Sequence, residues 1–218
     1  MFRFFILLGV LLHYQANAQA VFVNNSVLSG AVVSINEMNG LEIQGNPYLD
    51  EIFVEGTLGI NLEKPLPLKL RYNTFSGNVE YQGQDGRVYF VSPKHQVFSV
   101  RFGNYYLKNG FAKTEQQTEQ SMYQILHDGE TKLLKFTKGI LTDVTTYNEA
   151  AKQKRYDSIE YYYVEIDGAM LKIKRNKDSI LEALPKHKTE LEAYIKTEKM
   201  KFKSWEEVVK LLVFYEAI

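Results

Sequence analysis

The sequence predicts an α+β fold in which an antiparallel twisted sheet built from hairpins precedes two or three short helices. Three Asp-Gly pairs carry this prediction, at Asp85-Gly86, Asp128-Gly129 and Asp167-Gly168, because Asp-Gly is favoured where two adjacent turn residues need positive φ. Runs rich in Val, Tyr and Phe flank these pairs, as expected for half-buried strands. From Asn176 onward the apolar spacing becomes about 3.6 residues, which indicates helices, and helices that follow strands favour an α+β arrangement.

The first residues have the features of a secretory signal peptide. Arg3 is followed by an apolar run, Phe4–Leu12, that is too short to span a bilayer, and Ala16-Asn17-Ala18 fits the small-x-small cleavage pattern. The same pattern recurs two residues later, so the cleaved bond stays open near Ala18 and Gln19. No cysteine follows the apolar run, which excludes a lipid anchor. The expected location is the periplasm or the cell exterior.

Composition excludes several classes of partner. The 218 residues include 26 Lys and Arg against 26 Asp and Glu, and no long block of one sign favours nucleic acid or an anionic membrane. No later apolar stretch could cross a membrane, so we expect no transmembrane segment in the mature chain. An exported chain without cysteine is stabilised by burial and not by disulfides.

Three segments are expected along the chain: a signal peptide over 1–18, an antiparallel β-sheet domain over 19–175, and a helical segment over 176–218 that packs on the sheet. The strands expected before the first Asp-Gly pair or just after it are 20–33 (one or two strands), 52–60, 68–72 and 96–102. Pro65 and Pro67 should mark a loop or a sheet edge, because proline cannot donate to a ladder.

The hairpin at Asp85-Gly86 predicts one apolar and one wet face. A two-residue turn pairs Tyr81 with Phe90 and Gln82 with Tyr89, and paired residues share a face. The apolar face would carry Val79, Tyr81, Val88 and Phe90, and the wet face Glu80, Gln82, Gln84 and Arg87.

The hairpin at Asp167-Gly168 predicts an apolar face from three cross-strand pairs. These are Ile166 with Ala169, Val164 with Leu171 and Tyr162 with Ile173. The opposite face would place Tyr163 against Lys172 and Tyr161 against Lys174, where a cation and a ring can stack for about 0.5 to 1 kcal/mol.

The hairpin at Asp128-Gly129 gives a mixed pattern. A two-residue turn puts Ile125 opposite Lys132 and Gln124 opposite Leu133. Either the loop is longer than two residues, or both faces of these strands are buried. The segments 112–120 and 148–157 are polar, lack apolar periodicity and are expected as exposed loops.

Capping residues define the C-terminal helices. Asn176 can cap a helix through Leu184, with Pro185 ending it or starting the next. The second helix would present Leu191, Tyr194 and Ile195 on one stripe. Ser204 and Glu207 form a capping box for a last helix, whose apolar face would carry Val208, Leu211, Leu212 and Tyr215.

Several short motifs resemble a group of uncharacterised exported proteins common in Bacteroidetes-type bacteria. They are Asn46-Pro47-Tyr48-Leu49, Leu70-Arg71-Tyr72-Asn73, Asp128-Gly129 followed by Lys132-Leu133-Leu134-Lys135, and the terminal helices ending in Phe214-Tyr215. The resemblance extends over most of the mature chain. It implies an envelope location and assigns no catalytic residue.

Catalytic motifs are missing from the sequence. Thiol chemistry is excluded because there is no cysteine, no Gly-x-Ser-x-Gly elbow occurs, and His95, His127 and His187 lack the spacing of a metal site. The carboxylates Glu80, Asp85 and Glu165 on strands are expected to be solvated. The sequence therefore favours a protein without a cofactor, a metal or catalytic residues.

Aromatic residues supply the binding candidates. The chain has 15 Tyr and 13 Phe against one Trp, and a concave sheet lined by such side chains can hold apolar ligands or sugars, although aromatic residues also simply suit strands. The candidate binding residues are Tyr161, Tyr163, Lys172, Lys174 and Tyr72. The leading hypothesis is a non-enzymatic envelope protein that binds a protein or a surface component. The alternative is a periplasmic carrier of acyl-chain ligands with an open-barrel sheet.

Overall fold

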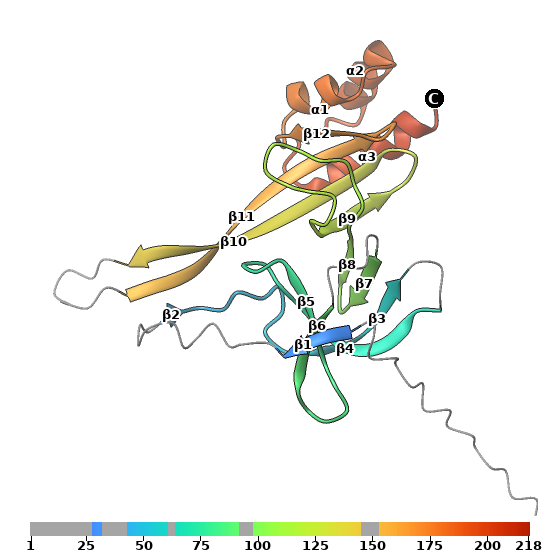
Figure 1. Ribbon diagram of the computed structural model, residues 1–218. Coiled ribbons are helices and arrows are strands. Elements are labelled where there is room, and N and C mark those ends of the chain that lie inside the picture. Colours follow the sequence, from blue (N-terminus) through green and yellow to red (C-terminus); the bar gives the residue numbers. More distant parts are fainter. Residues whose placement is uncertain (1–27, 32–42, 61–63, 92–97, 145–152) are drawn as a thin grey trace, which may run out of the picture.

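The computed structural model describes residues 28–31, 43–60, 64–91, 98–144 and 153–218. Its fold is α+β, as the sequence predicts: a curled, largely antiparallel sheet followed by three C-terminal helices (Figure 1). The strands are β1 (Leu28–Ala31), β2 (Ile43–Gln44), β3 (Val54–Ile60), β4 (Leu66–Asn73), β5 (Asn78–Gln82), β6 (Val88–Val91), β7 (Phe98–Phe102), β8 (Tyr105–Lys108), β9 (Tyr123–Asp128), β10 (Lys132–Val144), β11 (Gln153–Ile166) and β12 (Ala169–Ile173). The helices are α1 (Lys177–Ala183), α2 (Lys188–Thr197) and α3 (Trp205–Glu216). The signal peptide, most of the expected strand over 20–33, and His95 lie outside the described residues.

The strands follow one path through the sheet. Their order is β1-β6-β5-β4-β3-β7-β8-β9-β10-β11-β12, and β2 pairs in parallel with β11. β9 pairs with β10 only up to Lys135, and β12 pairs with β11 only from Tyr162. Apart from the short pairing with β2, the rest of β10 and β11 therefore continues as a two-stranded ribbon (Figure 1). We call this ribbon, residues 136–144 and 153–161, the arm.

Three apolar clusters form among the described residues. Leu58, Leu70 and Val100 are fully buried inside the curled part made by β1 and β3–β8, and each such side chain contributes roughly 1.5–3 kcal/mol. A second cluster joins the face of β10–β12 to the helices. A third covers the opposite face of the same strands beneath the segment 109–122. Among the described residues, no helix is long and apolar enough to cross a membrane.

The Asp167-Gly168 hairpin confirms the predicted register and part of the predicted apolar face, because Val164 and Ile173 are buried in the cluster that faces the helices. All three apolar pairs and the pair of Tyr163 with Lys172 form, and both turn residues have positive φ, 50° and 80°. However, Leu171 is 38% exposed while Tyr163 is only 3% exposed. Helices cover one face of β11 and the segment 109–122 covers the other, whereas Leu171 lies on the outermost strand. Since β12 ends at Ile173, Lys174 does not pair with Tyr161, and its N–H donates to Ser179 Oγ instead.

The Asp85-Gly86 register was wrong by one residue. Tyr81 pairs with Tyr89, and Glu80 pairs with Phe90, because the loop holds three residues. Gly83 N–H donates to Arg87 O at 2.8 Å, and of the loop residues only Gly86 has positive φ, which is the bulged three-residue form of a hairpin. The buried face therefore carries Val79, Tyr81 and Val91 with Tyr89 packed against them. The predicted wet face was also wrong, since Glu80 is 2% exposed.

The Asp128-Gly129 hairpin confirms both alternatives for its mixed pattern. Lys132 pairs with Asp128, so the loop is longer than two residues, and the register shifts between Leu133 and Leu134. Leu133 and Leu134 are both fully buried, in clusters on opposite faces.

The remaining strand predictions are confirmed with small shifts. The expected strands 52–60, 68–72 and 96–102 correspond to β3, β4 and β7. Pro67 pairs with Thr57 of β3 on one side. On the other side the pairing of β4 with β5 begins only at Lys69, so Pro67 lies at an edge, as predicted. The loop expectation for 148–157 was wrong for its described part, because Gln153–Asp157 belong to β11 and pair along β10. The segment 112–120 is irregular, but Gln117 within it is buried.

The helices form where the capping residues predict them. Asn176 Oδ1 accepts a hydrogen bond from Ser179 N at 3.0 Å, and α1 ends before Leu184. Leu191 and Ile195 of α2 are buried, and Tyr194 packs partly against the same cluster. The predicted apolar face of α3 is confirmed in full, with these four residues buried: Val208, Leu211, Leu212 and Tyr215. The capping box takes a different form from the one predicted: Ser204 makes no side-chain cap bond, and Glu207 accepts from the N–H groups of Lys201 and Lys203, which precede the N-cap.

Candidate binding cleft

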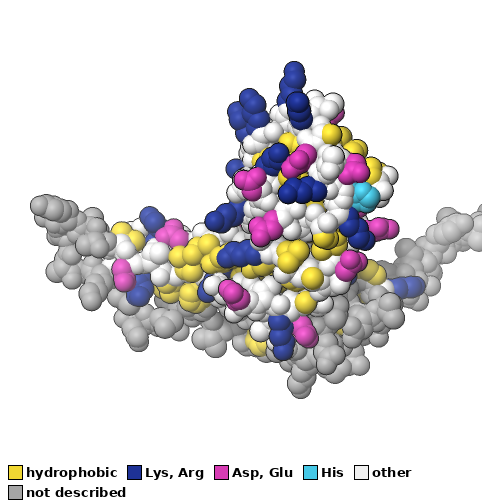
Figure 2. Space-filling view, turned by 90° about the horizontal axis from the view of Figure 1, so that it is seen from above, with side chains coloured by type: hydrophobic (Ala, Val, Ile, Leu, Met, Phe, Trp, Pro, Cys, Tyr) yellow, Lys and Arg dark blue, Asp and Glu magenta, His cyan; other side chains and the backbone are white. Residues whose placement is uncertain are grey.

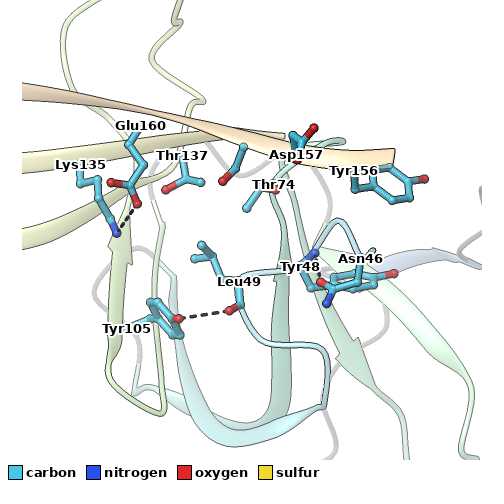
Figure 3. Close-up of a pocket in the computed structure, with 11 residues that line it drawn as sticks. Asn46, Tyr48, Leu49, Thr74, Tyr105, Lys135, Thr137, Tyr156, Asp157 and Glu160 are labelled. Atoms are coloured by element: carbon cyan, nitrogen blue, oxygen red, sulfur yellow. Dashed lines mark hydrogen bonds and ion pairs between the residues drawn. The ribbon is translucent and has the colours of Figure 1, made fainter. Parts of the chain in front are cut away.

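A polar cleft of about 360 Å³ lies between the base of the arm and the chain segment that follows β2. Figure 3 shows one wall formed by side chains of β10 and β11 and the other by residues before β3, with Tyr105 from β8 and Thr74 from the β4–β5 turn. The lining residues are Asn46, Tyr48, Leu49, Thr74, Tyr105, Lys135, Thr137, Tyr156, Asp157, Ser158 and Glu160.

A close backbone contact holds the two walls together. Gly139 N–H of β10 donates to Thr74 O at 2.9 Å, and Thr74 donates through its N–H and its Oγ1 to Pro47 O at 2.7 and 2.8 Å. A Cβ atom on Gly139 would lie 2.7 Å from Phe75 N. Glycine is therefore required where the arm crosses the β4–β5 turn.

The arm side of the cleft carries an ion pair anchored to the helices. Lys135 Nζ lies 3.1 Å from Glu160 Oε1, and the Tyr162 hydroxyl donates to the other oxygen of Glu160. The Tyr162 ring stacks on Trp205 of α3 at 3.7 Å between centroids. Burial alone would raise the pKa of Glu160, but the hydrogen bonds from Tyr162 and Lys135 outweigh it and hold that pKa below its ordinary value.

The second carboxylate of the cleft is also compensated. Asp157 accepts from Arg155 Nε at 3.0 Å and from Thr142 Oγ1 at 2.5 Å. These hydrogen bonds, that from Arg155 first, lower the pKa of Asp157. Both carboxylates are therefore ionised at neutral pH, each beside its own cation, and together they add little net charge to the cleft.

The opposite wall is fixed by Arg71, which projects from β4 between two aromatic rings. Its guanidinium carbon lies 3.8 Å from the Tyr48 ring centroid and 4.3 Å from that of Phe53. Arg71 also pairs with the buried Glu80 at 2.7 Å and donates to the Tyr48 hydroxyl at 2.9 Å. Tyr105 donates to Leu49 O at 3.1 Å. This wall is held in place before any ligand arrives.

The cleft can offer hydrogen bonds but lacks an activated nucleophile. Its hydroxyl groups belong to Thr, Ser and Tyr side chains, and no histidine lines it. His127 instead contacts Glu216 at the end of α3 at 3.1 Å, and its side chain is largely buried. Among the described residues, no three His, Asp or Glu side chains lie close enough together to hold a metal ion.

None of the five candidate residues from the sequence lines the cleft. Tyr161 and Lys172 do meet, with Lys172 Nζ 4.5 Å from the ring centroid. Tyr163 is buried and donates to Gln117 Oε1 at 2.7 Å. Lys174 is exposed after β12, and Tyr72 is buried inside the curled part of the sheet.

The three carboxylates considered from the sequence have separate partners. Glu80 pairs with Arg71, Glu165 with Lys132 at 2.8 Å, and Asp85 with the Tyr89 hydroxyl at 2.7 Å. The expectation that all three are solvated was wrong for Glu80, because a cross-strand arginine allows its burial, and for Glu165, whose side chain is only 13% exposed beside Lys132.

A scan of protein-family models and searches of curated proteins and solved structures found no match to this chain.

Proposed function

We propose that the chain is an exported, non-enzymatic envelope protein that binds a partner by taking a polar segment of it into the cleft. The observation that carries this proposal is the construction of the cleft. Two separately anchored walls, joined at Gly139 and Thr74, present uncharged hydrogen-bonding groups and compensated carboxylates. A preformed site loses little ordering entropy on binding.

The carrier of acyl chains receives less support. The sheet is curled, as that alternative requires, but Leu58, Leu70 and Val100 on its inner face are 0% exposed, which leaves no water-sized space against them. An acyl chain needs an apolar cavity, since it gains about 0.8 kcal/mol per buried CH₂. Lipid at near one-to-one stoichiometry in the purified mature protein would favour the carrier instead.

The N-terminal sequence supports the exported part of the proposal. A chain purified from its native host should begin near Gln19, because the apolar run before it is long enough for targeting and too short for anchoring. Retention of Met1 in the soluble fraction would contradict export.

Site-specific photocrosslinking in the native host tests the binding role. We expect a photoreactive amino acid at Ser158, in the cleft, to give a discrete adduct with one partner. The same amino acid at Lys186, exposed between α1 and α2, is the control and should give none. Adducts of equal yield from both positions, or no adduct from Ser158, would contradict a binding role for the cleft.

A further inference from the structure

We propose that the partner segment is an extended peptide that adds to the sheet as a strand, along the edge of β11 that no described strand covers between β2 and β12. This inference rests on the proposed binding function and names the chemistry of the partner. The proposed site consists of main-chain groups of β11 beside the cleft, and side-chain motifs in a sequence do not reveal such a site.

The edge of β11 is interrupted between two short partners. β12 pairs with β11 over Tyr162–Ile166, and β2 pairs with Lys154 and Arg155. Over Tyr156–Tyr161, β11 pairs with β10 on one side, and within the described ranges no strand pairs with it on the other. The gap of six residues corresponds to roughly 20 Å of extended chain.

The register shows which main-chain groups face this gap. In a two-residue hairpin the residues that flank the turn, Ile166 and Ala169, exchange both hydrogen bonds, so every second residue back from Ile166 directs its N–H and C=O toward β12. This alternation reaches Glu160 and Ser158, whose main-chain groups therefore face the gap.

The contact of the arm with the β4–β5 turn supports this assignment independently. Gly139 is the cross-strand partner of Ser158, and its N–H points away from β11 toward Thr74 O. Gly139 and Ser158 are therefore a non-hydrogen-bonded pair, and in an antiparallel ladder both members of a non-hydrogen-bonded pair direct their N–H and C=O groups away from each other's strand. Ser158 therefore presents a donor and an acceptor to the open side of β11.

The side chains around the gap suit an added strand. Ser158 and Glu160 project into the cleft, while Ile159 between them lies on the other face of the arm. Ile159 is 41% exposed, and Figure 2 shows hydrophobic side chains gathered along the arm. A strand beside β11 would cover Ile159 with one side chain and place the next in the cleft, which is how strand addition combines main-chain affinity with side-chain specificity.

The occupant is a peptide because β2 already uses this edge in the same way. Ile43 and Gln44 pair in parallel with β11, and the chain then departs at Gly45, which has φ of 73° and whose Cβ position lies 3.2 Å from Tyr156 O. Alternating donors and acceptors along an edge are a template for another main chain, and an acyl chain offers no group that could pair with them. Because each cleft carboxylate has its own cation, an uncharged or weakly charged segment fits best.

A pair of variants at one position separates main-chain from side-chain recognition. Ser158→Pro removes the outward N–H and leaves the β10 ladder intact, since proline is tolerated where the N–H faces away from the neighbouring strand. Ser158→Ala removes only the hydroxyl. The probe is a displayed library of random octapeptides selected on the purified mature protein. We expect selected peptides to bind Ser158→Pro at least about tenfold more weakly, or ~1.4 kcal/mol, and Ser158→Ala within about threefold of the parent. Equal affinity for all three proteins would overturn the proposal.

Backbone methylation of a selected peptide gives a readout that does not depend on the variants folding. Methylation of every second peptide nitrogen should abolish binding to the parent protein, and methylation of the intervening nitrogens should be tolerated. Insensitivity to methylation at every position would overturn strand addition. If that result accompanies a partner adduct at Ser158, the binding function stands and only the inference about its mode falls.

Discussion

Gly139 and Thr74 join the two parts of the molecule through a main-chain hydrogen bond of 2.9 Å. The bond connects the middle of β10 to the β4–β5 turn, and Phe75 of that turn meets Tyr156 of β11 edge to face at 5.6 Å. The cleft exists because this contact fixes the angle between the arm and the curled part of the sheet. The contact itself requires that position 139 have no side chain.

Gly139→Ala should destabilise the protein by about 1–3 kcal/mol, the range for an overpacked site. The added Cβ would lie 2.7 Å from Phe75 N and 2.8 Å from Phe75 Cα, so backbone must move to accept it. Urea unfolding measures the change, and Lys138→Ala, at the exposed neighbouring position, serves as the control. Coincident unfolding midpoints for the two variants would show that the arm and the turn are not in close contact.

Arg71→Met should cost about 3–5 kcal/mol, because it leaves the carboxylate of Glu80 buried without a cation. Lys69→Met is the matched control on the same strand. Its partner Glu55 lies 4.0 Å away and both side chains are largely exposed, so that pair contributes about 0–1 kcal/mol. Restoration of stability by Arg71→Met combined with Glu80→Gln would support the assignment. Equal losses in the two single variants would contradict the burial of Glu80.

Stability should fall as pH rises from 10 toward 12. Burial, with the neighbouring Tyr89 and Asp85, raises the pKa of Tyr81 from 10.0 to about 12. A hydroxyl that ionises later in the folded state than in the unfolded state contributes stability below pH 10, and that contribution is lost as pH rises through the folded-state pKa. Unfolding midpoints measured between pH 8 and 12 should therefore decline less steeply for Tyr81→Phe than for the parent. Parallel declines would exclude this role for Tyr81.

The sequence predicted the elements better than the faces they bury. Asp167-Gly168 set a register because both of its residues take positive φ, whereas Asp85-Gly86 did not, because only the glycine does. The burial of Glu80 depends on Arg71, which pairs with it across the strands, and the exposure of Leu171 depends on its place at the edge of the sheet. Strand alternation contains no information about such neighbours.

The cleft could not be predicted because its residues come from separate elements. Alternation along β11 places Ser158 and Glu160 on one face, but only the tertiary contact at Gly139 brings Asn46 and Tyr48 opposite them. The aromatic signal led to Tyr161 and Tyr163, which lie on the other face of β11. Composition pointed to aromatic side chains in general. The curl of the sheet determines which aromatic side chains line the cleft, and these are Tyr48, Tyr105 and Tyr156.

Amide hydrogen exchange resolved by NMR tests the free edge of β11 most directly, and it needs no ligand. The amides of Asp157 and Ile159 face β10, opposite Ile140 and Lys138, and should be protected from exchange. The amides of Ser158 and Glu160 face the gap and should exchange at least about tenfold faster, since hydrogen-bonded strand amides open rarely and solvated ones exchange freely. This alternating pattern is the result expected if β11 is open to a partner strand. Equal protection of all four amides would show that the edge is already covered and would contradict the account.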